Sequence, residues 1–188
     1  MNIFFLDDDP VLAARQHNDA HVGKMLLEAV QMMSDQARAQ GLPVGYERLS
    51  KGHQKHPMTL WVGASREHYD WCWNLALELD AEHQRRFDTE HSSGKHLPSL
   101  AVAAHAMPDK PWRNPPRCMP DEFKVNYDDH AASGRSESCH VRSYRDYYRF
   151  KVIEAGLHVA AGNARHRRMT MWTKTPEPVW LRQTEFAW

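Results

Sequence analysis

The sequence predicts a mainly α-helical protein that folds as a compact single domain over residues 1–188, with a short N-terminal strand and proline-rich wrapping loops. Three observations support this fold class. Apolar residues recur at helical spacing in several long segments. A length of 188 residues is commonly served by one hydrophobic core. Five prolines gather between residues 108 and 120, where they enforce an extended path rather than a helix.

The first segment, Ile3–Leu6, is apolar and is predicted to form a short buried strand. Three consecutive aspartates and Pro10 follow it. This run ends the strand and can cap a following helix that carries proline in its first turn. The amino end of the chain is therefore expected to be fixed in the fold.

Five further helical segments are predicted by spacing and capping residues. The clearest covers Asp19–Gln40, where apolar residues recur at helical spacing before Gly41 and Pro43. Ser65 is typical of the N-cap of a long helix that runs to about Phe87. Shorter helical segments are expected at residues 58–62 and 100–107, and a last helix at residues 143–157. The basic stretch at residues 48–57 is expected to be a surface loop.

Charge and cysteine content limit the function classes. The 24 basic residues balance 24 acidic ones, which excludes a uniformly cationic nucleic-acid binder, so any DNA site must be a local patch. Three widely spaced cysteines without a C-x-x-C pair favour a reducing compartment. The chain contains no apolar run long enough to cross a membrane. We therefore expect a cytoplasmic protein with no membrane partner; the sequence leaves its oligomeric state open.

One helix stripe has the composition of a catalytic site. If the helix extends back to His17, then His17, His21, Lys24 and Glu28 fall within a stripe roughly 60° wide. A carboxylate beside imidazoles and an amine suits general acid and base chemistry. The stripe lies roughly 125° from the apolar centre of the helix, which is also typical of a solvated face.

A metal site is a weaker alternative. His17 and His21, one helical turn apart, could share a divalent ion with His53 or His56. This spacing is permissive, and no recognised ligand signature occurs. We therefore expect neither a metal nor a cofactor.

Two other groups of residues suit contact with nucleic acid. Basic side chains precede Pro57 and recur on the long helix, where they could contact phosphates or simply be solvated. These are Lys51, His53, Lys55, His56, Arg66, Arg85 and Arg86. Near residue 148, Arg145, Tyr148 and Lys151 can share a helix face beside Tyr144, Tyr147 and Phe150. Aromatics interleaved with cations suit base stacking as well as ordinary helix packing.

The arrangement resembles the phage endonuclease V family of pyrimidine-dimer DNA glycosylases. The residues that carry the resemblance are Glu28 in a polar-striped first helix and the histidines of Gly52-His53 and His56-Pro57. A long helix that ends at residues 82–86 and a late Tyr147-Tyr148 pair complete it. Together these features span most of the chain.

The resemblance implies a compact, mostly helical fold and a DNA glycosylase/lyase activity. It implies that an N-terminal amine is the nucleophile at the sugar C1′ and that Glu28 is the assisting carboxylate. The family has a small second residue, whereas this chain has Asn2. That difference leaves two alternatives open: a transferase that hypermodifies a DNA base in a phage-type pathway, and a non-enzymatic nucleic-acid or nucleotide-binding protein.

Overall fold

The computed structural model describes residues 1–47, 50–132, 134 and 136–182, and the regular structure in these ranges is helical. The α-helices are α1 (Pro10–Gln16), α2 (Asp19–Ala39), α3 (Lys51–Gln54), α4 (Pro57–Val62), α5 (Arg66–Phe87), α6 (Leu97–Ala101), α7 (Tyr127–Ala132) and α8 (Cys139–Ala160). Short 3-10 helices follow several of them. The predicted mainly α-helical fold is confirmed.

The prediction of a short N-terminal strand is wrong, since the described residues contain no strand there. Ile3, Phe4, Phe5 and Leu6 are at most 4% exposed, but they form no strand. The backbone N–H of Leu6 instead donates to the carbonyl of Phe4 at 2.9 Å, which is a local turn. The segment is apolar because it lies inside the helical core, and burial alone produces the same sequence pattern as a buried strand.

The first long helical segment is divided in two. Asp9 caps α1, which carries Pro10 at its start, as the sequence predicts. The chain is extended at His17 and Asn18, and the Asn18 side chain accepts the backbone N–H of His21 to cap α2. As a result, His17 lies at the end of α1 rather than on the face of α2.

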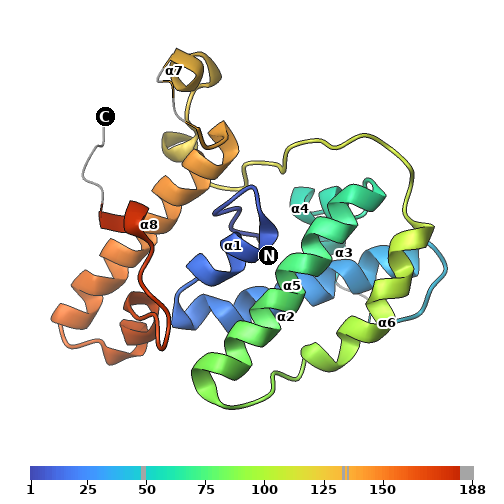
Figure 1. Cartoon of the computed structure of the whole chain (residues 1–188), viewed down its shortest axis with the longest axis horizontal. Helices are drawn as coiled ribbons and strands as arrows, with labels where there is room; N and C mark the ends of the chain where they lie inside the picture. Colours follow the sequence, from blue (N-terminus) through green and yellow to red (C-terminus); the bar gives the residue numbers. More distant parts are fainter. Residues whose placement is uncertain (48–49, 133, 135, 183–188) are drawn as a thin grey trace.

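Helices α2 and α5 form the centre of the molecule and run antiparallel (Figure 1). Arg86 at the end of α5 contacts Asp19 at the start of α2. Gly63, just before α5, lies against Gln36 near the end of α2. The predicted Ser65 cap is confirmed, since its side chain accepts the backbone N–H of His68. One apolar cluster extends from Ile3 to Trp180 through these helices.

The proline-rich segment at residues 108–120 passes over the helical core as an extended connection between the 3-10 helix that follows α6 and the short helical segment before α7 (Figure 1). The backbone of Arg113 ties it down: its carbonyl accepts the indole N–H of Trp61 at 2.8 Å, and its N–H donates to His68 at 2.8 Å. The predicted wrapping loop is thus present. The expected loop at residues 48–57 contains α3, and its first two residues, Arg48 and Leu49, lie outside the described residues.

Helix α8 packs against the side of the core and is followed by a return segment that reaches Trp180. It is longer at both ends than the predicted helix at residues 143–157, and it begins earlier because Ser138 supplies an N-cap. None of the described helices is long and apolar enough to cross a membrane.

Candidate active site

The amino end of the chain lies against the middle of α2, beside Glu28. The backbone N–H of Asn2 donates to Oε2 of Glu28 at 2.7 Å. The terminal amine of Met1 lies 3.9 Å from the same oxygen. The side chains of Met1 and Glu28 are only 4% and 15% exposed, so water screens their interaction weakly. Two nitrogen groups therefore converge on one carboxylate.

Positively charged and imidazole side chains surround this carboxylate. The amine of Lys24 lies 3.9 Å from Oε1 of Glu28 and is largely exposed. Burial lowers the pKa of His56, and the positive charges of the terminal amine and of His53 lower it further, whereas Glu28 raises it. These effects place His56 within electrostatic reach of both the amine and the carboxylate. The site thus combines an amine, a carboxylate and an imidazole.

The other side of the site is formed by residues 116–118 and by α8. The side-chain amide of Asn2 donates to the carbonyl of Cys118 at 3.0 Å, and the hydroxyl of Tyr144 lies 3.3 Å from the Asn2 amide oxygen. Burial raises the pKa of the Cys118 thiol, although the positive charges of Lys124 and the terminal amine act to lower it. The proline-rich segment therefore closes the site around the first two residues.

The predicted stripe on the first long helix is only half correct. Lys24 and Glu28 come together, but the two histidines lie in the core. His21 is 5% exposed, and its Nδ1 lies 2.9 Å from the hydroxyl of Tyr148. His17 is fully buried, and its Nδ1 donates to the carbonyl of Ala13 at 2.8 Å. The stripe fails because the helix breaks at Asn18, which turns His17 away from α2.

Burial also decides the protonation of these histidines. Burial lowers the pKa of His17 to about 4, and it lowers the pKa of His21 well below its usual value. The positive charges of Lys24 and Lys151 lower the pKa of His21 further. Both imidazoles are therefore neutral at pH 7 and serve as core groups. Among the described residues, no cluster of His, Cys, Asp or Glu side chains is arranged to hold a metal.

The aromatic and cationic residues of α8 do not share one exposed face. Tyr148 is fully buried and its hydroxyl accepts the backbone N–H of Asn18 at 2.8 Å, so it cannot stack on a base at the surface. Arg145 donates to the carbonyl of Leu6 and to Asp7. Lys151 lies 5.0 Å from the centre of the Tyr147 ring. The three predicted contacts therefore do not form one exposed nucleic-acid surface.

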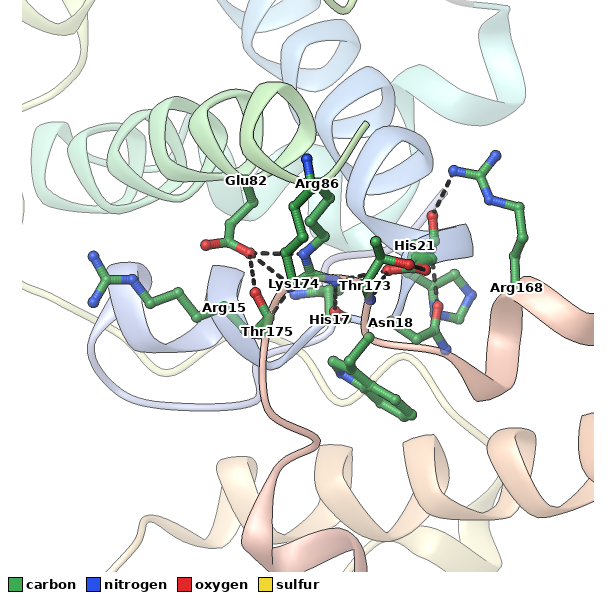
Figure 2. A network of polar contacts seen from close by, with 12 residues as sticks. Arg15, His17, Asn18, His21, Glu82, Arg86, Arg168, Thr173, Lys174 and Thr175 are labelled. Atoms are coloured by element: carbon green, nitrogen blue, oxygen red, sulfur yellow. Dashed lines mark hydrogen bonds and ion pairs between the residues drawn. The ribbon is translucent and has the colours of Figure 1, made fainter. Parts of the chain in front are cut away.

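Arg86 is a core residue rather than a surface phosphate ligand. Its side chain is 0% exposed and pairs with Glu82 at 2.7 Å and with Asp19 at 3.2 Å. Its remaining donors reach the carbonyls of His17 and Arg15. Figure 2 shows this network and the return segment, Thr173 to Thr175, that closes it. A guanidinium enclosed in this way cannot contact DNA.

The basic residues of α3 and of its C-cap are better placed for such a contact. Lys51, His53 and Lys55 are exposed, and His53 lies close enough to His56 for its charge to lower the His56 pKa. These exposed basic side chains therefore lie on the solvent side of the site around Glu28. The three side chains are thus available to an anionic ligand at the edge of the site.

Two clefts lie elsewhere in the part of the chain that the structure describes. One of about 680 Å³ lies between α1, α5 and residues 174–179, and one of about 440 Å³ is lined by polar side chains that include Asp80 and His91. Neither is lined by Glu28 or its neighbours. They are separate from the carboxylate site.

The residues that sequence reasoning missed are Asn2, Cys118 and Tyr144. Asn2 is separated from Glu28 by 26 positions and from Cys118 by 116, so no periodic pattern links them. The family resemblance was the one signal that named an N-terminal amine and Glu28 together. Tyr144 was noted only as a ring on an aromatic helix.

We compared the chain with protein-family models, with curated proteins and with solved structures, and none of the three comparisons found a match. The resemblance to the endonuclease V family thus gains no support from them. The functional assignment depends on the geometry around Glu28.

Proposed function

We propose that this protein is a DNA-base-directed enzyme of the glycosylase/lyase type, in which Glu28 is the general acid or base. One observation carries the proposal: Oε2 of Glu28 lies 2.7 Å from the backbone nitrogen of Asn2 and 3.9 Å from the amine of Met1. A nucleophilic amine needs an adjacent base that accepts its proton. The shielded carboxylate of Glu28 supplies that base.

The chemistry follows from this pair. The neutral amine attacks C1′ of the target nucleotide, the new C–N bond forms, and the bond from C1′ to the base breaks. The base leaves with the electron pair and takes a proton. Glu28 accepts a proton from the attacking nitrogen and returns it to O4′ as the bond from C1′ to O4′ breaks, which opens the sugar ring to an imine, while the departing base takes its proton from water. Lys24 and His56 lie next to the carboxylate and can orient it or donate to a phosphate.

The local charge supports an anionic substrate. The chain is neutral overall, yet a lysine and two imidazoles lie in the neighbourhood of the Glu28 carboxylate. Lys24 pairs with Glu28, His56 interacts electrostatically with it, and His53 acts on His56 from the solvent side. A positive patch of this kind suits phosphate contacts, which need charged donors at the surface. DNA is therefore the proposed partner.

The test uses duplex DNA that carries an abasic site or ultraviolet photoproducts. The protein should cleave it, and borohydride should trap a covalent adduct, because only an amine nucleophile forms a reducible imine. Glu28→Gln should lose both signals, whereas Glu154→Gln, an exposed glutamate on α8, should retain them. Adduct formation that persists in Glu28→Gln would remove the carboxylate from the mechanism.

The nucleophile itself is tested at the first residues. Chains that begin at Met1, that begin at Asn2, or that carry a Gly-Ser extension should differ in trapping. A chain that begins at Asn2 places its amine at the nitrogen position that already lies 2.7 Å from Glu28, so it should be the fastest. The extended chain should form no adduct. Equal trapping by all three chains would exclude the terminal amine.

A second candidate is a transferase that modifies a DNA base. It is favoured by one observation: the nitrogen closest to Glu28 belongs to the peptide bond between Met1 and Asn2, and a peptide nitrogen is not a nucleophile. Glu28 would then activate a nucleophile of a cosubstrate. No borohydride adduct would form, and nucleosides of DNA from cells that produce the protein would gain mass unless Glu28 is replaced. Salt-dependent DNA binding without either reaction would leave a binding protein.

A further inference from the structure

The side chain of Asn2 is held from two sides by parts of the chain that are distant in sequence. Its Nδ2 donates to the carbonyl of Cys118 at 3.0 Å, and its Oδ1 lies 3.3 Å from the hydroxyl of Tyr144. The same hydroxyl donates to the carbonyl of Pro116 at 2.7 Å and accepts the backbone N–H of Cys118 at 3.3 Å. Tyr144 thus connects α8, the proline-rich segment and the second residue.

We propose that Tyr144 and residues 116–118 form a clamp that positions the amino end of the chain on Glu28. In this clamp, Asn2 and Tyr144 are positioning residues, since their side chains act through the backbone nitrogens of residues 1 and 2. The inference rests on the proposed function for its catalytic consequence. The geometry of the clamp stands by itself.

Tyr144 has the properties that a fixed anchor needs. Its side chain is fully buried, and its ring meets the ring of Phe4 edge-on with the centroids 6.4 Å apart. Burial raises the pKa of the phenol well above its usual value, so the hydroxyl stays protonated and remains a donor. A buried hydroxyl with several partners keeps one orientation, because any rotation leaves a polar atom unsatisfied.

Asparagine at position 2 matches both sides of the clamp. Its Nδ2 donates to the Cys118 carbonyl, and its Oδ1 is a second, more distant acceptor for the single Tyr144 hydroxyl proton, which the Pro116 carbonyl also accepts. Aspartate would lose the donor and would add a negative charge near Glu28. Alanine would lose both bonds. With the side chain fixed, the backbone N–H of Asn2 points at Oε2 of Glu28.

The clamp matters because a free amino end samples many directions. Holding a nucleophile beside its base converts a rare encounter into the resting geometry, and small misplacements reduce turnover strongly. We expect Tyr144→Phe and Asn2→Ala each to lower kcat on abasic duplex DNA by about 10- to 100-fold. KM should stay within about 2-fold, because neither side chain lies among the exposed cations. Tyr46→Phe, which removes a hydroxyl that contacts Ser93 outside the clamp, should leave both unchanged.

A second measurement does not depend on activity. Reductive methylation with formaldehyde and cyanoborohydride labels free amines, and mass spectrometry compares the α-amine with the exposed Lys95 of the same molecule. In the native protein, the amine paired with Glu28 should react slowly relative to Lys95. In Tyr144→Phe and Asn2→Ala, labelling of the α-amine should be at least 3-fold faster, while Tyr46→Phe should match the native protein.

The outcomes separate the clamp from the proposed function. Unchanged α-amine labelling and unchanged kcat in Tyr144→Phe, with activity still lost in Glu28→Gln, would overturn the clamp and leave the function in place. Faster labelling in the clamp variants of a protein that does not act on DNA would support the clamp and overturn the function. Near-native thermal unfolding of Tyr144→Phe checks that the fold is intact. If Tyr144→Phe does not fold, Asn2→Ala provides the same test, because Asn2 lies in an irregular segment rather than in a helix.

Discussion

The guanidinium of Arg86 and the carboxylate of Asp19 form a buried ion pair, 3.2 Å apart, that joins the end of α5 to the start of α2. Glu82 completes it from one turn earlier on α5, and the return segment closes it through Thr173 and Thr175 (Figure 2). An enclosed charge of this kind holds four parts of the chain together. Its removal leaves the buried carboxylate of Asp19 without a charged partner and leaves Glu82 paired only with Arg85.

Replacement of Arg86 by methionine should therefore destabilise the protein strongly. Breaking a buried pair from one side costs about 3–5 kcal/mol, since the opposite charges remain buried. For a chain of this length, that loss lowers Tm by roughly 10 °C. Urea and thermal unfolding measure it. Arg66→Ala, which removes an exposed pair with Asp70, should cost under about 1 kcal/mol. Similar costs for the two variants would contradict the role of Arg86.

The free energy of unfolding should also decrease as the pH is lowered, because His17 is buried. Burial lowers its folded-state pKa to about 4 from 6.5 in the unfolded chain. Between these values the unfolded state binds a proton that the folded state does not, so stability decreases as pH falls from about 6.5 to 4. The contribution is on the order of 3 kcal/mol. Urea unfolding at pH 7.5, 6 and 5 should show a shallower decrease in His17→Gln than in the control His105→Gln, whose histidine is exposed.

The parts of the fold that were predictable depend on local chemistry. Ser65 and the periodic residues after it define α5, because a cap and a helical repeat act within a few residues. The apolar run Ile3–Leu6 was predicted as a strand, and it is buried without a strand partner. Burial requires apolar residues in either case, so composition cannot distinguish the two.

The candidate site was less predictable because it is built by contacts between distant segments. Glu28 was expected from the helix stripe, but Asn2 and Tyr144 reach it only through packing of the amino end, the proline-rich segment and α8. Arg86 shows the opposite error. A basic residue on a helix is usually solvated, and only the position of Asp19 and Glu82 around it shows that it is buried.

Two glycines with similar backbone angles should respond differently to substitution. Gly45 has φ +76°, and a Cβ there would lie 2.0 Å from Oγ of Ser34. Gly41 has φ +82° and no atom within 4 Å of such a Cβ. Gly41→Ala should cost about 1 kcal/mol from the left-handed backbone alone. Gly45→Ala should cost clearly more, because it also breaks the bond from the Tyr46 N–H to Ser34. Equal unfolding midpoints would refute this difference.

The exposed lysines at the start of α3 and just after its end give the last prediction, which concerns DNA directly. Lys51 and Lys55 are exposed beside the surroundings of Glu28 and carry no catalytic role in the proposed mechanism. If each contacts a phosphate, alanine at either position should weaken binding to any duplex sequence alike. It should also reduce the slope of log affinity against log salt concentration by about 0.9, and the double variant by about twice that.

Fluorescence anisotropy of a labelled duplex that carries an abasic-site analogue, measured between about 50 and 200 mM KCl, gives that slope. Lys110→Ala is the matched control, since Lys110 is exposed on the proline-rich segment outside the residues that surround Glu28. A slope that is unchanged in the double variant would place the DNA elsewhere on the protein. A reduced slope with an unchanged cleavage rate at saturating DNA would show that these lysines bind phosphate but take no part in the reaction. Binding that is equal in the ground state and the transition state leaves kcat unaltered.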